Sequence, residues 1–356
     1  MSVHLDLHRH LEGSHSPTAL LDVARRFDVR DPLFFDDARG AFRTAEALTS
    51  SLTMVAPSDD ATVFYDCIVR ARRAYVSVEA IGALAVLAFR EAAADTDGFE
   101  MRISLFSMAR TLIENQRLAW REVAPLVFAE RYARPVLLAV LAARDAVLAE
   151  TGTPMVVRLG LSRTFESEPH YRALAAVVKE HAEGLVGLDV LGIVTGADKE
   201  PMPAALAQIL DELRVSLPDL TIHAGEFEGH ASIDRTLALQ PRGIGHGVHA
   251  LQSPRTLERL AAEGVTLEVC PTSNRMLIPS SLRALEADTR MAPLVALQRA
   301  HVRCVLGSDD PTPLGTSFRG ELAIATALGV DLARLEHDAL RRWQQMTGAP
   351  LSKGAS

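Results

Sequence analysis

The segment Leu5-Asp6-Leu7-His8-Arg9-His10-Leu11-Glu12-Gly13-Ser14 decides the fold. Residues 3–7 alternate apolar and polar side chains, a pattern typical of a β-strand. Side chains two positions apart in a strand share a face, so His8 and His10 are expected together at the strand's end. Two imidazoles on one face can bind one metal ion. Taken alone, such a pair more often consists of surface or structural histidines, so a metal site requires further ligands from the rest of the chain.

Seven more short apolar segments follow, separated by amphipathic stretches. The eight strands are expected at 3–7, 99–105, 154–161, 185–191, 219–223, 242–246, 264–269 and 302–307. Helices are expected at 16–27, 61–94, 136–150, 170–182, 203–215, 254–263, 291–300 and 317–328. Eight strand–helix alternations predict an α/β protein with a (β/α)8 TIM barrel, whose active-site groups follow the C-terminal ends of the strands.

The connection between the first two strands is long. We expect a lid-like helical insertion at about residues 30–98, with its extra helices over the barrel mouth. A further helix is predicted at 112–133, with a break at Arg134-Pro135 because proline disfavours helical backbone in the residue before it. Residues 1–349 are predicted to form one domain, and the small, polar segment 350–356 a flexible tail.

Composition narrows the function classes. The 356 residues carry a formal net charge of -8 without a Lys/Arg-rich block, so a nucleic-acid partner is not expected. The sequence shows neither a signal peptide nor a long uncharged apolar run, so a cytoplasmic protein without a membrane partner is expected. Three cysteines, Cys67, Cys270 and Cys304, do not suggest a disulfide framework.

Polar residues follow several of the predicted strands. They are His223 and Glu226 in TIHAGE, His246 in GIGHG, and Asp309 and Asp310 in GSDDP. Three histidines and a carboxylate suit one zinc-like ion with a position open for water, and the natural set is His8, His10, His223 and Asp309. Glu226 is then a candidate proton donor, and His246 a candidate group to orient or deprotonate the water. Asp310 is placed to hydrogen-bond a substrate.

Together these motifs resemble the adenosine deaminase family of metal-dependent amidohydrolases. HRHLEGS, DVLG, TIHAGE, GIGHG, EVCPTSN and GSDDP occur in the family's order between residues 8 and 311. The resemblance implies a TIM barrel with one Zn2+ per chain, which removes a purine 6-amino group as ammonia. By position, it matches Glu226 to the acid that protonates purine N1, and His246 to the residue that serves the attacking water. It also matches Asp310 to the contact with N7, and Gly192 to a backbone contact with N3.

Two departures from the family bear on the substrate. Many members follow the Gly192 position with Asp-Glu, whereas this chain has Ile193-Val194, which predicts a less acidic site wall. Glu12 stands where adenosine-specific members often have Asp, the residue that meets the ribose 5′-hydroxyl. Glutamate there also occurs in members that act on free adenine or modified nucleosides, so Glu12 is a predicted substrate-binding residue.

The sequence therefore predicts a zinc-dependent deaminase of adenosine or a modified adenosine, with a small purine nucleoside or base as its partner. Deamination of free adenine or of another aminated heterocycle is the alternative enzyme. A nucleoside-binding homologue with weak turnover is the alternative outside that class. The intact set of Glu226, His246 and Asp310 argues against the last. The sequence does not specify the oligomeric state.

Overall fold

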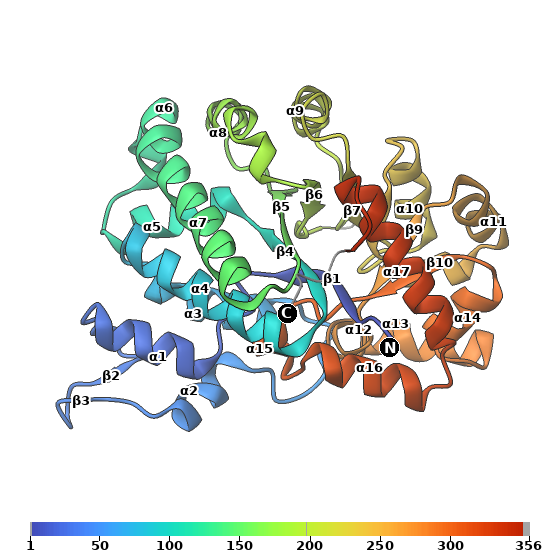
Figure 1. The fold of residues 1–356 in the computed structure, drawn as a ribbon, viewed down its shortest axis with the longest axis horizontal. Helices are drawn as coiled ribbons and strands as arrows, with labels where there is room; N and C mark the ends of the chain where they lie inside the picture. Colours follow the sequence, from blue (N-terminus) through green and yellow to red (C-terminus); the bar gives the residue numbers. More distant parts are fainter. Residues whose placement is uncertain (1, 197, 352–356) are drawn as a thin grey trace.

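The computed structural model describes residues 2–196 and 198–351, and a parallel eight-stranded sheet lies at its centre (Figure 1). The strands are neighbours in the order β1-β4-β5-β6-β7-β8-β9-β10. A parallel bridge between Arg9 and Asp309 joins the last strand to the first and closes the barrel. The strands span Leu5–His10, Gly98–Ile103, Met155–Ser162, Gly187–Leu191, Leu220–Ala224, Gly243–His246, Thr266–Val269 and Arg303–Leu306. All eight predicted strands and the TIM barrel are confirmed.

Helices surround this sheet and bury their apolar faces against it (Figure 1). Before β6 they are α1 Pro17–Arg26, α2 Ala45–Leu52, α3 Thr62–Ala71, α4 Val78–Asp95, α5 Leu105–Asn115, α6 Pro125–Val127, α7 Arg134–Thr151 and α8 Glu168–Glu180. After β6 they are α9 Ala204–Arg214, α10 His230–Leu237, α11 Pro254–Glu263, α12 Pro271–Leu277, α13 Pro279–Thr289, α14 Pro293–Arg299, α15 Pro311–Leu314, α16 Phe318–Ala327 and α17 Leu332–Thr347. Within the described ranges, none is long and apolar enough to cross a membrane.

Local signals explain where these helices begin and end. The Ser253 hydroxyl accepts the Thr256 amide at the start of α11, and Gly264 ends that helix at a φ of 67°. The Asp331 side chain caps α17 in the same way, by accepting the Arg334 amide. The helices that cover the barrel therefore have starts and stops that the sequence itself encodes.

Three helix predictions need correction. The predicted helix 61–94 is two helices, α3 and α4, separated by a 3-10 turn at Arg72–Ala74. The predicted helix 112–133 does not exist as one unit, because α5 already begins at Leu105 and a second helical run starts at Pro125. The predicted break at Arg134-Pro135 is wrong. A wider π turn at Phe128–Ala133 leads directly into α7, where Pro135 falls in the first turn and needs no amide partner.

The insertion between β1 and β4 reaches the barrel mouth through α3. Phe64 and Cys67 of α3 pack with Met276 and Leu277 of α12 and with Leu314 of α15. The segment before α3 is fastened to the same loops, since the Ser58 amide donates to the Met276 carbonyl. The small β2–β3 hairpin, at Phe35–Asp36 and Ala41–Phe42, extends away from the barrel with α1 and α2 (Figure 1). Of the predicted tail, only Pro350 and Leu351 lie inside the described residues, and Leu351 packs beside β1.

Candidate metal and catalytic site

The C-terminal ends of four strands bring the predicted metal ligands together. His8 and His10 come from β1, and His223 from β7. Asp309 follows β10 and is tied to β1 by its backbone, because its amide donates to the His8 carbonyl and its carbonyl accepts the His10 amide. His246 ends β8, and its ring lies 5.0 Å from that of His8. All five side chains are buried.

The spacing of these atoms fits a small tetrahedral cation. The Nε2 atoms of His8 and His10 are 3.2 Å apart, and the Asp309 Oδ1 lies 3.6 Å and 3.4 Å from them. Bonds of about 2.0–2.1 Å to a tetrahedral zinc ion place its ligand atoms about 3.3 Å apart. The ring of His223 lies 4.7 Å from that of His8, and the two also form a possible ligand group with His246. The residues present therefore fit the metal that the sequence predicts.

Two of these residues have an unusual backbone. His246 and Asp309 both adopt a positive φ, near 60°, a conformation that side chains other than glycine rarely take. Such strain persists where the surrounding structure fixes it, and it gathers at functional sites. Gly245, the neighbour of His246, makes room for the cluster. A Cβ atom there would lie 3.0 Å from the rings of both His223 and His8.

A second layer of polar groups orients the imidazoles. The Nδ1 atoms of three rings face acceptors: Glu268 at 3.2 Å for His8, Asp189 at 3.1 Å for His223, and Asn274 at 3.1 Å for His246. Arg102 ties the first two supports together through Asp189, at 3.1 Å, and Glu268. A proton on each Nδ1 leaves Nε2 free for the centre of the cluster, which is how metal-binding histidines are commonly held.

Two further carboxyl groups border the cluster. Glu226 lies in the turn after β7, with its Oε2 3.5 Å from the His246 Nε2. Burial, followed by the charges of Asp309 and Glu200, raises the pKa of Glu226 well above its usual value. Burial and the charge of Asp309 raise the pKa of Asp310 in the same direction. Burial lowers the pKa of His246 to about 3. The environment therefore favours the protonated form of both acids and the neutral form of the imidazole.

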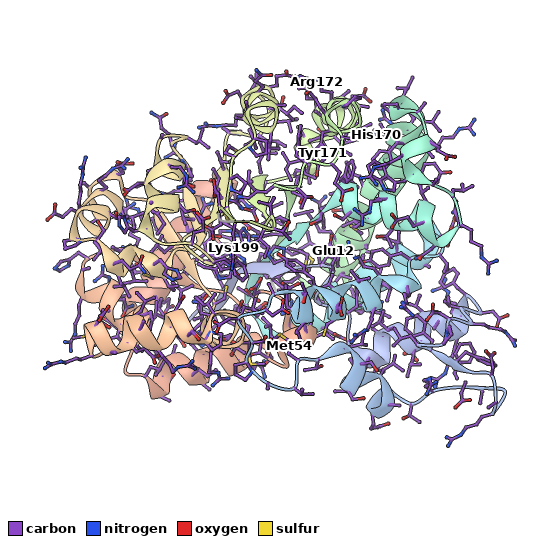
Figure 2. All side chains as sticks on the ribbon, turned by 180° about the vertical axis from the view of Figure 1, so that it is seen from behind. Glu12, Met54, His170, Tyr171, Arg172 and Lys199 are labelled. Carbon is purple, nitrogen blue, oxygen red and sulfur yellow. The ribbon has the colours of Figure 1, made fainter. Side chains whose placement is uncertain are left out.

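The three predicted substrate contacts, Glu12, Gly192 and Asp310, follow strands at the same end of the barrel. Glu12 is buried, and its Oε1 accepts the Ser104 amide at 2.9 Å, while its Oε2 has no hydrogen-bond partner. The Oδ1 of Asp310 is likewise buried without a partner. Gly192 follows β6 at a φ of 81°, and Arg163 links its carbonyl to that of His223. In Figure 2, Glu12 is labelled near the middle of the molecule, whereas His170 and Arg172 lie on the outer helix α8.

Sequence reasoning missed several residues of this site. Tyr65 on α3 packs against the cluster that contains Met276 and Leu277, and burial, followed by the charges of Glu226, Asp310 and Asp309, raises its pKa. Glu200 contacts the turn that carries Glu226. Asn274 and Glu268 lie inside the motif EVCPTSN, which held the signal for them. Neither Tyr65 nor Glu200 belongs to a recognisable motif, so only the fold reveals them.

Comparison with known proteins follows the same motifs. The family model for adenosine deaminase matches residues 4–346. The chain belongs to the adenosine deaminase family. A putative adenosine/adenine deaminase of Streptomyces coelicolor is 29% identical over 350 residues, which cover 94% of this chain and 90% of that protein. An adenine deaminase of Chelativorans sp. is 38% identical over 133 residues, but this match spans 37% of this chain and only 39% of that relative.

Solved structures of the family share the fold. The adenine deaminase of Arthrobacter aurescens superposes with a TM-score of 0.74 over 96% of this chain and 94% of its own, at 18% identity. An amidohydrolase of Burkholderia ambifaria with bound zinc gives a TM-score of 0.66 at 14% identity, over 99% of this chain and 86% of its own. At these sequence identities, the two structural similarities show that the fold is shared and nothing more specific.

Proposed function

We propose that this protein catalyses the metal-dependent hydrolytic deamination of a 6-aminopurine, adenosine or a modified adenosine first, with release of ammonia. The observation that carries the proposal is the convergence of His8, His10 and Asp309 at the spacing of one metal ion, beside the buried acid Glu226. A zinc-type cluster next to a protonated carboxyl group suits the addition of water to an electron-poor ring carbon.

His8, His10, His223 and Asp309 are the residues that would hold the ion. When bound there, zinc supplies the Lewis acidity that makes water nucleophilic near neutral pH. The supports of His8 and His223, through Glu268 and Asp189, fix the rings for that task before any ligand arrives.

The remaining groups act on protons and on the purine. Glu226 donates its proton to N1, which makes C6 electrophilic toward water, and His246 accepts a proton from that water because its imidazole is neutral. Purine N7 is a hydrogen-bond acceptor, so Asp310 must donate, and its raised pKa favours the protonated form that this requires. The Gly192 amide supplies a donor for N3. His246 passes the proton taken from water to the amino group, and the proton of the new C6 hydroxyl returns to Glu226, so ammonia leaves from C6 as the carbonyl forms.

Free adenine is the second candidate substrate, and Glu12 is the residue that bears on the choice. The buried Oε2 of Glu12 lacks a donor. A free base offers its imidazole N–H as a donor, whereas a nucleoside offers sugar hydroxyls from the same side of the ring. A buried acceptor left unpaired disfavours the ligand that cannot satisfy it, so Glu12 is the residue at which the two substrates are distinguished.

The test is ammonia release by metal-replete protein from adenosine, 2′-deoxyadenosine, a 5′-substituted adenosine and adenine. The proposal predicts turnover of at least one of them, with a loss of roughly a hundredfold or more in Asp309→Ala. His337→Ala, which changes an exposed histidine of α17, serves as the control for purification. Metal-replete protein that releases ammonia from none of the four contradicts the proposal.

A further inference from the structure

Glu200 places a buried carboxylate beneath the turn that follows β7. It lies in the loop between β6 and α9 and is 5% exposed. Its Oε2 accepts the Gly225 amide at 2.8 Å, and its Oε1 accepts the amides of Glu226 at 3.0 Å and Phe227 at 2.8 Å. The Ser232 hydroxyl, in the first turn of α10, also donates to Oε2. One side chain therefore satisfies three consecutive backbone donors and ties the turn to α10.

The backbone of this turn determines where the Glu226 carboxyl group lies. Gly225 enters it at a φ of 64°, and a Cβ there would lie 2.5 Å from Ile233. Glu226 is buried, and its carboxyl group lies 3.5 Å from the His246 Nε2. A rotation of the turn would carry that carboxyl group away from its neighbour. Glu200 lies outside both the turn and β7. Its hydrogen bonds to the three amides therefore tie the turn to another part of the chain.

We propose that Glu200 is a positioning residue for this reaction, which holds the 225–227 turn so that the Glu226 carboxyl group faces the substrate. The inference rests on the proposed function, because it assigns Glu200 a role only through Glu226. Glu200 lies in the same loop as Gly192, so one loop carries both the predicted purine contact and the carboxylate that holds the turn of the predicted acid.

The inference also revises what the sequence predicts for this wall. Ile193-Val194 replace the acidic pair of many family members, and the wall was expected to be less acidic. The structure places a carboxylate from further along the same loop, that of Glu200, against the Glu226 amide. A second, outer glutamate also touches the loop: the Glu228 side chain accepts the Lys199 amide and pairs with Arg235 at 2.9 Å. Glu228 accepts none of the three amides that Glu200 holds, which makes it a matched control.

The experiment is steady-state kinetics of Glu200→Gln with the substrate that the wild type deaminates best. Glutamine has the same shape but presents an NH2 group toward the amides, so at least one of them loses its acceptor. We expect kcat to fall roughly ten- to hundredfold, because small displacements of a catalytic group cost about that much, while KM and zinc content stay within about twofold. Glu228→Gln is expected to change kcat by less than about threefold, since it leaves the turn intact.

A double-mutant cycle separates positioning from general destabilisation. If Glu200 acts through Glu226, Glu200→Gln adds less than about threefold to the loss already caused by Glu226→Gln. An independent structural role would instead multiply the two losses. Should Glu200→Gln fail to fold, Glu200→Asp takes its place in the cycle, because it keeps the charge and withdraws the oxygens by one methylene.

The outcomes are distinguishable. A wild type without activity defeats the proposed function, and near-normal turnover by Glu226→Gln defeats the acid role. With both of those intact, the inference is overturned if the Glu200 variant keeps its kcat, if its loss appears in KM or zinc content, or if the two losses multiply. A kcat loss that vanishes in the Glu226→Gln background supports it.

Discussion

At the residue scale, the account depends most on the proton carried by Glu226. Burial, then Asp309 and Glu200, raise its pKa, so the acid form persists to a higher pH than in an ordinary glutamate. Activity should therefore fall as the pH rises through that raised pKa. Glu226→Gln cannot donate in the same way, and we expect kcat to drop about 10²–10⁴-fold, with the alkaline limb of the pH–rate profile lost. If the fall in activity at alkaline pH is unchanged in Glu226→Gln, it reports the titration of another group, which contradicts the role given to Glu226.

A second residue-scale prediction concerns substrate choice. Glu12→Gln keeps the shape of the side chain but turns one acceptor into a donor. If the unpaired Oε2 meets an N–H or O–H of the substrate, the variant should lose roughly tenfold or more in kcat/KM for the preferred substrate and less for the poorer ones. An equal loss of kcat/KM for every substrate of the panel would show that Glu12 supports the fold and does not determine which substrate is preferred.

Residues of this site were predictable where a motif marked them. His8, His10, His223 and Asp309 follow strands whose apolar pattern is clear, and parallel strands in a barrel bring such ends together. Glu200 could not be found in this way, because its role depends on a loop folding back onto a turn 25 residues later, at the Gly225 amide. Three of its four hydrogen bonds come from backbone amides, which leave no trace in the sequence of their partner.

At the scale of the element, Gly245 tests how β8 accommodates the histidine cluster. Gly245→Ala places a Cβ 3.0 Å from the rings of His223 and His8, so those rings must move by a few tenths of an ångström. We expect zinc affinity to fall roughly tenfold or more, as when the support of a ligand is disturbed. The control is Gly82→Ala in α4, where the new Cβ meets Ala139 at 3.5 Å and metal affinity should not change. Equal zinc affinity in both variants contradicts the packing argument.

Strands were easier to predict than helices, and the reason is physical. Most strand residues are buried, and the strands read as short segments in which apolar residues recur and which polar segments delimit. Helices α12 and α13 begin at Pro271 and Pro279 within one continuous stretch, and no periodicity separates them. The π turn before α7 depends on local backbone geometry, so Pro135 was misread as the end of a helix.

At the scale of the whole molecule, buried charges run through the barrel from α17 to the candidate metal site. Arg342 of α17 donates to both oxygens of Asp219, at 2.6 and 2.7 Å. Arg158 bridges Asp219 to Glu100 at 2.8 Å each, and Glu100 bonds Arg102, which supports the histidines. Each member is buried, so each needs its partner.

Breaking this chain should destabilise the whole fold. Arg342→Met is expected to lower the free energy of unfolding by about 3–5 kcal/mol, measured by urea denaturation, because Asp219 loses one of its two arginines. Burial raises the pKa of Asp219, but the charges of Arg342 and Arg158 together outweigh this effect. The pKa of Asp219 therefore lies below its usual value. The stabilisation that ionised Asp219 gives to the folded state is therefore complete above its unfolded pKa of about 3.9. It is lost as the pH falls through the pKa of the folded state. A difference between variant and wild type that grows toward acid pH contradicts this assignment.

The central claim is that the histidine–aspartate cluster supports deamination of a 6-aminopurine. The most direct measurement is ammonia release from the best substrate of the panel by protein as purified, after metal removal by a chelator, and after addition of one equivalent of zinc. The account predicts that activity disappears with the metal and returns with about one ion per chain. Activity that persists in metal-free protein, or that zinc does not restore to a folded chain, contradicts it.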